Sequence, residues 1–226
     1  MNVRITSLFL FLTSIFVSTL IVSNIIAVKL IHILTLTLPA AIVVFPVTYI
    51  FGDILTEVYG YRRARLVIWL GFFANVVVVF FIKIGEWLPA ASFWTLQDAY
   101  RLILGYTPRI LLASFAAYLT GEFTNSYVLS KLKILTGGRW MWVRTIGSTL
   151  VGQLIDSGIF ITLAFAGTVG SALILRIVVA QWLFKTAYEA LATPLTYLIV
   201  GIVKRRENID TYDYDTDFNP LKLFSL

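Results

Sequence analysis

The sequence contains no cysteine and a single histidine, His32. Without cysteine, neither a disulfide framework nor a cysteine-ligated metal site is available, and one histidine leaves no cluster that would hold zinc. We therefore expect no metal and no other cofactor. Charged residues are also scarce, at 13% of 226 residues, whereas a soluble domain usually carries about 25%.

Hydrophobic residues, in contrast, make up 59% of the chain, and the mean hydropathy is +0.87. This composition is typical of a polytopic membrane protein. The net charge of +6 is compatible with nucleic-acid binding, but in a membrane protein it more often reflects basic cytoplasmic loops. We therefore expect lipid around the chain and no nucleic-acid partner.

Six segments have the length of about 20 mostly apolar residues that a helix needs to cross the hydrocarbon core. They predict an all-α fold, a bundle of six transmembrane helices. The first segment lacks the features of a cleavable signal peptide and is expected to be retained, and Pro194 is expected to bend the sixth. The expected spans are Ile5–Val28, Leu36–Tyr59, Ala64–Ile84, Ile110–Leu132, Val143–Ala166 and Ala172–Val203.

The basic residues predict the orientation of this bundle. Twelve of the eighteen lysines and arginines fall on the side shared by the two termini, and five fall on the other side. The excess predicts that both termini are cytoplasmic, with a transmembrane domain over residues 1–206 and an acidic cytoplasmic tail over 207–226. The longest external loop, 86–109, carries aromatic residues that suit either a short helix on the membrane surface or a lid over a site.

The segment Pro39–Arg65 is the most informative stretch of the chain. It begins as an apolar run, carries Asp53 and Glu57, and ends in a glycine followed by three arginines. Residues four apart share one face of a helix, so both carboxylates are expected to point the same way. An acidic group inside a membrane span is costly, which makes it a functional candidate by default.

Other expected spans carry polar pairs with the same helical spacing. Three pairs lie three or four residues apart, and Asn24 and Lys29 lie near the end of the first span. Because each pair shares a helical face, we expect the pairs to face a common interior. They are Glu122 with Asn125, Gln153 with Asp156, and Lys185 with Glu189.

Two interpretations of these groups remain open. They pair with one another to hold the bundle together, for example as an ion pair of Lys185 with Asp156 or Glu189, or they line a polar cavity. Interhelical polar contacts contribute only about 0.6 kcal/mol on average, whereas an ionisable group at mid-span costs roughly 2.5–3.5 kcal/mol. The difference favours a cavity that recognises a solute.

The chemistry of such a cavity suits a flat, polar solute. Carboxylates accept hydrogen bonds, and amides both donate and accept them. Three aromatic residues, Phe123, Trp182 and Tyr188, lie beside the polar groups in sequence, although side chains facing lipid are an equal alternative. A guanine-like base fits this inventory, and so do many other small polar solutes.

Six stretches resemble the queuosine precursor transporter family, also called the vitamin uptake transporter family, of bacterial inner-membrane proteins. The resemblance covers nearly the whole chain in order, and its most specific part is DILTEVYG with the arginines that follow. The stretches are SNIIAVKL (23–30), FPVTYIFGDILTEVYGYRRAR (45–65), TPRILLASFAAYLTGEFTNSYVLSKLK (107–133), RTIGSTLVGQLIDSGIFITLAFAG (144–167), FKTAYEALATPLTY (184–197) and TDFNP (216–220).

This resemblance implies import of a queuosine precursor, either 7-cyano-7-deazaguanine, 7-aminomethyl-7-deazaguanine or queuine, across the bacterial inner membrane. Trp182 is a candidate from the residues alone, and so is Glu122, which stands where the family commonly has glutamine. The substrate-binding candidates carried over by position are Asn24, Lys29, Asp53, Glu57, Asn125, Gln153, Asp156, Lys185 and Glu189.

The roles of these residues are hypotheses. Glu189 or Asp156 is expected to bind the N–H edge of the guanine-like ring, with Lys185 as a counter-charge that keeps the acid ionised. Asp53 and Glu57 are expected to form a gate, or an inner pair with Lys29 or with arginines.

Other functions are compatible with the same residues. A substrate-binding subunit of an ATPase-driven vitamin importer has this size, and the chain has no Walker motif of its own. An intramembrane aspartyl protease would use Asp53 and Asp156, but the combination of a Gly-Asp motif with a Tyr-Asp motif within the spans is missing, because the Tyr-Asp pairs at Tyr212 and Tyr214 lie in the tail; no enzyme is therefore expected. A proton or ion channel and a homodimeric assembly also remain open.

Overall fold

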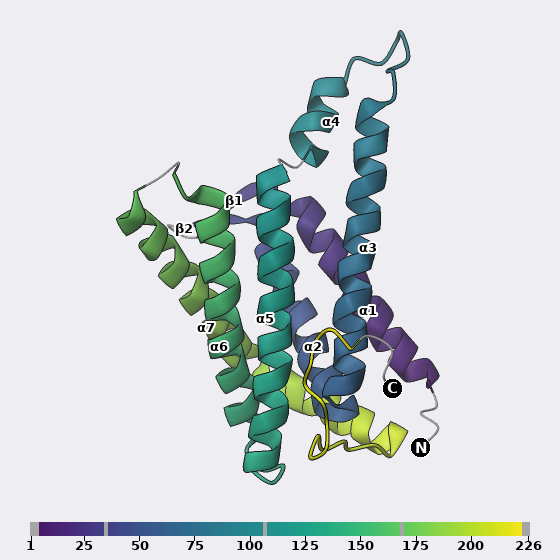
Figure 1. The fold of residues 1–226 in the computed structure, drawn as a ribbon, viewed down its shortest axis with the longest axis vertical. Helices are drawn as coiled ribbons and strands as arrows, with labels where there is room; N and C mark the ends of the chain where they lie inside the picture. Colours follow the sequence, from purple (N-terminus) through teal and green to yellow (C-terminus); the bar gives the residue numbers. More distant parts are fainter. Residues whose placement is uncertain (1–4, 34–35, 106–107, 168–169, 223–226) are drawn as a thin grey trace.

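The computed structural model describes residues 5–33, 36–105, 108–167 and 170–222. This described part is a bundle of helices with one short β-hairpin (Figure 1), which confirms the all-α class. The elements are α1 (Ser7–Ile26), β1 (Leu30–Ile33), β2 (Leu36–Pro39), the 3-10 helix η1 (Ala40–Val43), α2 (Phe45–Tyr59), α3 (Tyr61–Trp87), α4 (Gln97–Leu104), α5 (Pro108–Leu135), α6 (Met141–Phe165) and α7 (Ser171–Glu207).

Five segments of the described chain are long and apolar enough to cross a membrane: α1, α3, α6, α7 and the stretch that contains α5. The boundaries of these five helices lie within four residues of the expected spans. Together with α2 they make up the predicted bundle of six.

The first part of the expected second span is wrong. Residues Leu36–Pro39 form a strand that pairs antiparallel with Leu30–Ile33, and the α-helix begins only at Phe45. With 15 residues, α2 is about 22 Å long, which is shorter than the hydrocarbon core of about 30 Å. Pro39 and Pro46 explain the change, because neither has a backbone N–H and Pro46 occupies the first turn of α2, where that loss is tolerated.

Helix α2 lies at the centre of the bundle, in contact with α1, α3, α5 and α7. All of its residues from Asp53 to Tyr59 are buried, whereas a surface helix exposes one polar face. Phe16, Ile54 and Leu55 belong to the apolar core around it. The carboxylates of α2 must therefore find their partners within the protein.

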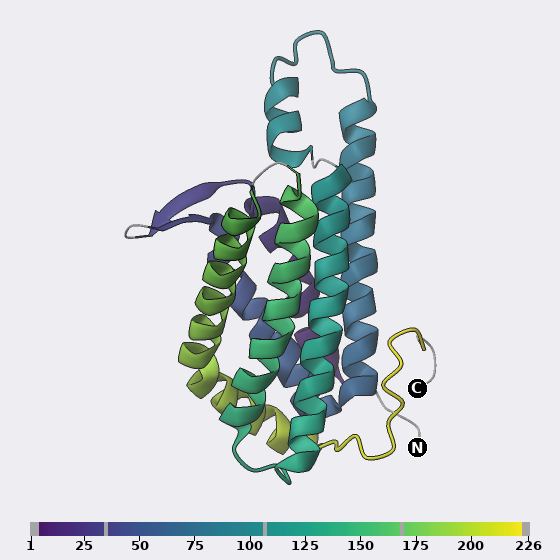
Figure 2. The same ribbon diagram turned by 60° about the vertical axis from the view of Figure 1, so that its left-hand side comes forward.

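Helix α7 runs for 37 residues without interruption and contains Pro194. It is bent, and its last part turns beneath the bundle (Figure 2). A proline inside a helix removes one backbone hydrogen bond and its ring crowds the preceding turn. The bend expected from the sequence is thus present.

The external loop contains a short helix, α4, one of the two alternatives that the sequence left open. It stands beyond the end of the other bundle helices beside α3 (Figure 1). Polar contacts attach it there. Tyr100 donates a hydrogen bond from its hydroxyl to the Ile82 carbonyl at 3.0 Å, and Gln97 donates to the Glu86 carbonyl at 3.2 Å. The loop is therefore held by α3.

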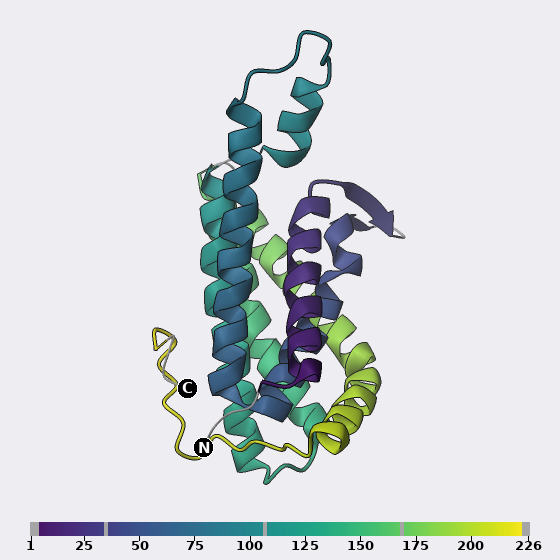
Figure 3. The ribbon, with the colours of Figure 1, turned by 90° about the vertical axis from the view of Figure 1, so that its right-hand side faces the viewer.

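Helix α1 begins and α7 ends at the same end of the bundle (Figure 3), as six alternating passages require. The α2–α3 and α5–α6 turns lie there too. We call it the basic end because it carries Arg62, Arg63, Arg65, Lys131 and Lys133. That this end faces the cytoplasm remains a prediction.

The chain after α7 folds back along the bundle onto α3 (Figure 2). The buried Arg65 side chain donates hydrogen bonds to the carbonyls of Asp217 at 3.1 Å and Asn219 at 2.8 Å, and Trp69 donates to the Pro220 carbonyl at 2.8 Å. The TDFNP stretch (216–220) is therefore the part of the tail that binds to α3. Residues 223–226 of the expected tail lie outside the described residues.

The same tail completes the junction between α2 and α3. The Asp213 carboxylate accepts a hydrogen bond from the Tyr61 N–H at 3.0 Å, at the first residue of α3. The Thr211 N–H donates to the Val58 carbonyl at 3.1 Å. Gly60 makes the turn with a φ of 82°, and a Cβ there would lie 2.7 Å from the Thr211 methyl group.

Replacing Asp213 with alanine is expected to lower the free energy of unfolding by about 1 kcal/mol, because the start of α3 loses its acceptor. Thermal unfolding of the purified protein in detergent measures the loss. Asp215→Ala is the matched control, since Asp215 is exposed two residues away. Equal melting temperatures for the two variants would contradict the capping role.

Candidate functional site

Eight of the eleven candidate residues lie in two groups inside the bundle. The first group comes from α2, α5, α6 and α7, and the second surrounds Glu57 at the basic end. We call the first group the central cluster; it consists of Asp53, Glu122, Asn125, Gln153, Asp156, Lys185 and Glu189.

Close contact between α5 and α6 positions part of the central cluster. A Cβ built at Gly121 would lie 2.8 Å from the Cβ of Asp156, and one at Gly152 would lie 2.8 Å from the Cβ of Asn125. Small residues let membrane helices approach in this way. Asn125 then reaches across to α2, where its Nδ2 donates to Asp53 Oδ1 at 2.8 Å.

An ion pair joins α6 to α7 in the same cluster. The Lys185 ammonium lies 2.5 Å from Asp156 Oδ2. It also lies over the rings of Phe45 and Tyr49, 5.8 and 5.9 Å from their centroids. Lys185 therefore pairs with Asp156, one of the two alternatives that the sequence left open, and Glu189 is left without this cation.

Several acceptor atoms of the central cluster have no hydrogen-bond donor in the described part of the chain. Their residues are at most 5% exposed, and a buried polar atom without a partner costs about 1–3 kcal/mol, more when it is charged. Acceptors of this kind are complementary to a ligand that brings hydrogen-bond donors. The atoms are Asp53 Oδ2, Asn125 Oδ1, Gln153 Oε1 and both carboxylate oxygens of Glu189.

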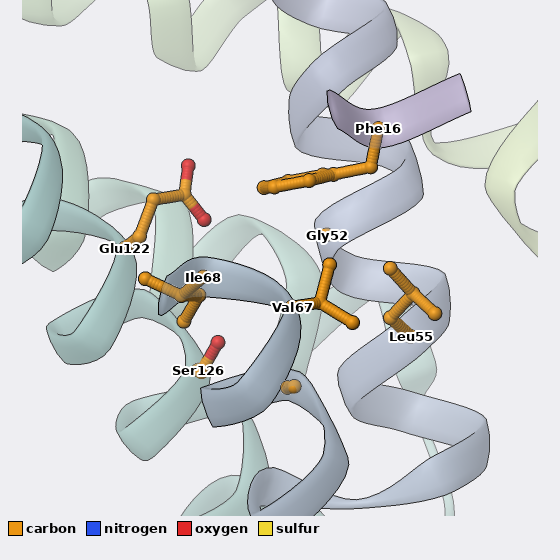
Figure 4. Close-up of a pocket in the computed structure, with 8 residues that line it drawn as sticks. Phe16, Gly52, Leu55, Val67, Ile68, Glu122 and Ser126 are labelled. Carbon is orange, nitrogen blue, oxygen red and sulfur yellow. The ribbon is translucent and has the colours of Figure 1, made fainter. Parts of the chain in front are cut away.

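Glu122 links these acceptors to a crevice between the helices. It is close enough to Asp156, Lys185 and Glu189 to interact electrostatically with each. Figure 4 shows its carboxylate pointing toward the Phe16 ring, above Gly52, whose missing side chain leaves the space open. The crevice is too narrow to admit a water molecule. A wet chamber, as expected from the sequence, requires the helices to move apart here.

The second group seals the basic end. Glu57 is 1% exposed and binds Arg144 through both carboxylate oxygens, at 2.8 and 3.2 Å. Its Oε1 atom also lies 2.8 Å from the Lys204 ammonium and 3.6 Å from that of Lys133. One buried carboxylate thus joins α2, α5, α6 and α7.

Asp210, just after α7, completes this basic-end network. It lies 2.5 Å from Lys133 and 2.8 Å from Lys204. Burial alone would raise the pKa of the Asp210 carboxyl, but the hydrogen bonds from the two lysines hold that pKa below its ordinary value. We define the basic-end network as Glu57, Lys133, Arg144, Lys204 and Asp210.

The sequence anticipated only part of this network. An arginine does pair with Glu57, but Lys29 does not take that place: it is exposed and directly precedes β1, at the opposite end of the bundle (Figure 1). Lys133, Lys204 and Asp210 were not candidates. The available signal was their position at helix ends next to the basic turns.

The remaining candidates lie elsewhere. Asn24 lies outside the central cluster. Its Nδ2 donates a hydrogen bond to Asn75 Oδ1 of α3 at 2.7 Å. Trp182 donates from its indole to the Leu150 carbonyl at 2.8 Å, a contact between α7 and α6. The aromatic rings next to the central ion pair are those of Phe45 and Tyr49, which the sequence-based reasoning missed.

Within the described residues, no group of three or more histidine, cysteine, aspartate or glutamate side chains is arranged to hold a metal ion. The donor set of the central cluster mixes carboxylates, amides and an ammonium. Such a set can form hydrogen bonds with a polar organic molecule.

The chain is similar to proteins that are named as transporters. Residues 39–199 match the model of a family described as "Putative vitamin uptake transporter". A protein of Bacillus subtilis (strain 168), named "Probable queuosine precursor transporter", is 31% identical over 188 residues, which cover 82% of this chain and 81% of the relative. A protein of the same name from Haemophilus influenzae (strain ATCC 51907 / DSM 11121 / KW20 / Rd) is 26% identical over 121 residues, 54% and 49% of the two chains. No solved structure matches the chain.

Gly152→Ala is expected to displace Asn125 and to weaken substrate binding, because the added Cβ would lie 2.8 Å from the Cβ of Asn125. A titration of the purified protein with a queuosine precursor measures the change in Kd. Gly158→Ala on the same helix is the control, since a Cβ there meets nothing within 4 Å. Unchanged affinity in a folded Gly152→Ala protein would contradict the proposed helix contact.

Glu57→Gln is expected to destabilise the protein by about 3–5 kcal/mol, because it leaves buried cations without their shared carboxylate. Thermal unfolding in detergent tests this. The control is Glu86→Gln, which removes the more exposed pair with Lys83 and should cost no more than about 1 kcal/mol. Similar losses from the two substitutions would mean that the network does not hold the basic end together.

Proposed function

The chain belongs to the vitamin uptake transporter family, and from this premise we propose that it imports a queuosine precursor: 7-cyano-7-deazaguanine, 7-aminomethyl-7-deazaguanine or queuine. Members of this family are transporters rather than enzymes, and the chain is a multi-pass membrane protein that moves a small molecule. The observation that carries the choice of substrate is the set of buried acceptors without donors in the central cluster.

A 7-deazaguanine ring presents hydrogen-bond donors along one edge, from its ring N–H and its amino group. Asp53 is the acceptor best suited to this edge, since Asn125 orients it through one oxygen while the other oxygen is unpaired. The Asn125 and Gln153 carbonyl oxygens supply two more acceptors from α5 and α6. The donor edge of the base can satisfy a carboxylate oxygen and an amide oxygen at the same time. Water could also bond to these oxygens, but it would not select one solute over another.

This assignment moves the N–H edge to Asp53 from Glu189 or Asp156, the two residues that the sequence suggested. Asp156 is occupied by Lys185 at 2.5 Å. The ion pair, with Phe45 and Tyr49 against the ammonium, forms one polar wall of the proposed site. The flat rings of these two residues offer apolar surface for a planar substrate.

Import requires the site to open alternately to the two sides of the membrane. We place the basic end in the cytoplasm of a bacterium and the protein in the inner membrane, with lipid around its apolar surface. The basic-end network then closes the cytoplasmic side, and its separation would release the substrate inward.

The alternative is a substrate-binding subunit driven by a separate ATPase module. Purified protein alone in liposomes separates the two functions, whether it acts as a monomer or as a homodimer. Uptake without ATP supports an autonomous transporter. Binding of the precursor without any uptake would support the alternative.

The direct test supplies each radiolabelled precursor to these liposomes. Saturable uptake of at least one is expected, and Asp53→Asn should reduce it at least tenfold, the effect of losing about 1.4 kcal/mol from one charged hydrogen bond. Asp98→Asn is the control, because that side chain is 94% exposed on α4. Uptake of none of the three, or full uptake by Asp53→Asn, would contradict the proposal.

The same substitutions can be scored in cells. In a strain that cannot make the base, queuosine in tRNA should appear only when the chain and a transported precursor are both supplied. Cells without the chain are the reference, because a precursor that enters them unaided cannot report on transport by the chain.

A further inference from the structure

Glu189 is a buried carboxyl group that the binding of an N–H edge does not use. It is 1% exposed, and neither of its oxygens has a hydrogen-bond donor among the described residues. Its helix, α7, packs against α6 and α2. An ionised carboxylate in such a place is far more costly than a neutral one.

The charged groups around Glu189 do not neutralise it. Lys185, one turn away on α7, is held by Asp156 of α6 at 2.5 Å. Asp53 of α2 and Glu122 of α5 are close enough to interact with Glu189 electrostatically, and both add negative charge. Tyr49, Glu57 and Tyr59 are the other titratable groups of α2, and Glu57 is committed to the basic-end network.

The number of acidic groups in the central cluster also disfavours an ionised Glu189. Four carboxyl groups (Asp53, Glu122, Asp156 and Glu189) share one ammonium, Lys185. Within its described length, α1 adds no titratable side chain. A protonated carboxyl would remove a charge and also gain an O–H donor. Before substrate binds, Asp53 Oδ2 is an unpaired acceptor for that donor.

We propose that Glu189 carries a proton that enters the cell together with the substrate, so that the chain is a proton symporter. This inference rests on the proposed function, which supplies the cargo. It adds the coupling ion and the residue that binds it, neither of which follows from the family.

The two ligands support each other's binding in this mechanism. The Glu189 carboxylate takes a proton from external water. The resulting O–H donates to the ring carbonyl of a 7-deazaguanine, next to the ring N–H that Asp53 accepts. When the basic end opens, water reaches Glu189, the carboxyl returns its proton to the cytoplasm, and the ring carbonyl loses its donor.

A proton suits this site better than a sodium ion. Sodium needs a cage of several oxygen ligands, and within the described residues no group of three or more histidine, cysteine, aspartate or glutamate side chains is arranged to hold a metal ion. A proton needs only one carboxyl and one acceptor. Sodium coupling is therefore a separate outcome of the test.

The first experiment measures accumulation in liposomes that contain only the purified protein. With the membrane potential clamped at zero and no sodium present, an inward gradient of one pH unit should concentrate the labelled precursor about tenfold, the value for one proton per substrate. A pH-sensitive dye in the lumen should report acidification when substrate is added.

The outcomes separate the two proposals. Substrate entry that ignores the pH gradient, or that follows a sodium gradient instead, overturns proton symport and leaves the proposed function intact. No entry of any precursor under any gradient overturns the proposed function itself.

The second experiment tests the residue. Glu189→Gln keeps the size and a donor but cannot release a proton, so exchange of labelled for unlabelled substrate should continue while accumulation driven by the pH gradient disappears. Glu86→Gln, at the end of α3, should accumulate substrate as the unmodified protein does. Full gradient-driven accumulation by Glu189→Gln would exclude this residue as the proton carrier.

A measurement on the unmodified protein keeps the assignment testable if the glutamine variant does not fold. A hydrophobic carbodiimide reacts with protonated carboxyl groups in apolar surroundings, and mass spectrometry locates the adduct. Modification of Glu189 that substrate suppresses is expected. Modification of Asp53 or Glu122 with Glu189 untouched would overturn the assignment.

Discussion

The burial of α2 on every side is the constraint on which the rest of the structure depends. Because this helix meets protein on all sides, its polar groups must be satisfied by neighbouring helices. Asp53 and Glu57 stand one turn apart, yet they receive different partners. Glu57 is held by Arg144 and two lysines, whereas Asp53 receives one amide donor and keeps one oxygen free. A single helix therefore carries both a closed end and an incomplete site.

This arrangement connects substrate binding at Asp53 with opening of the basic end in the proposed mechanism. The closed end and the site share α2, so a ligand that changes the position of Asp53 also acts on the helix that holds Glu57. The surrounding structure suits such movement. Helix α2 is short, a hairpin and a 3-10 turn precede it, and Gly60 follows it with a positive φ. The tail adds a contact at the same junction through Thr211.

Hydropathy and helical spacing predicted most of the fold. Five spans and the bend at Pro194 follow from apolar length and from proline chemistry, whereas the short helix in the external loop was one of two alternatives that the sequence left open. The start of α2 did not, because a hydropathy window cannot distinguish the strand Leu36–Pro39 from a buried helix. For the site, the spacing of three or four correctly grouped the polar pairs on α5, α6 and α7. It gave no distances between helices, so the choice of Asp156 over Glu189 as the partner of Lys185 required the structure. The aromatic neighbours could not be chosen from the sequence, since residues adjacent in sequence, such as Tyr188 and Glu189, point about 100° apart around a helix.

If the buried acceptors form one chamber that the substrate enters, the absence of native cysteine allows this to be measured directly. Ser157 lies one turn after Gln153 on α6 and is fully buried, so Ser157→Cys places a single thiol beside the cluster. The rate at which a small methanethiosulfonate reagent modifies this thiol should fall several-fold when the transported 7-deazaguanine is present. A thiol that reacts equally fast with and without the substrate, in a variant that still transports, would contradict the account.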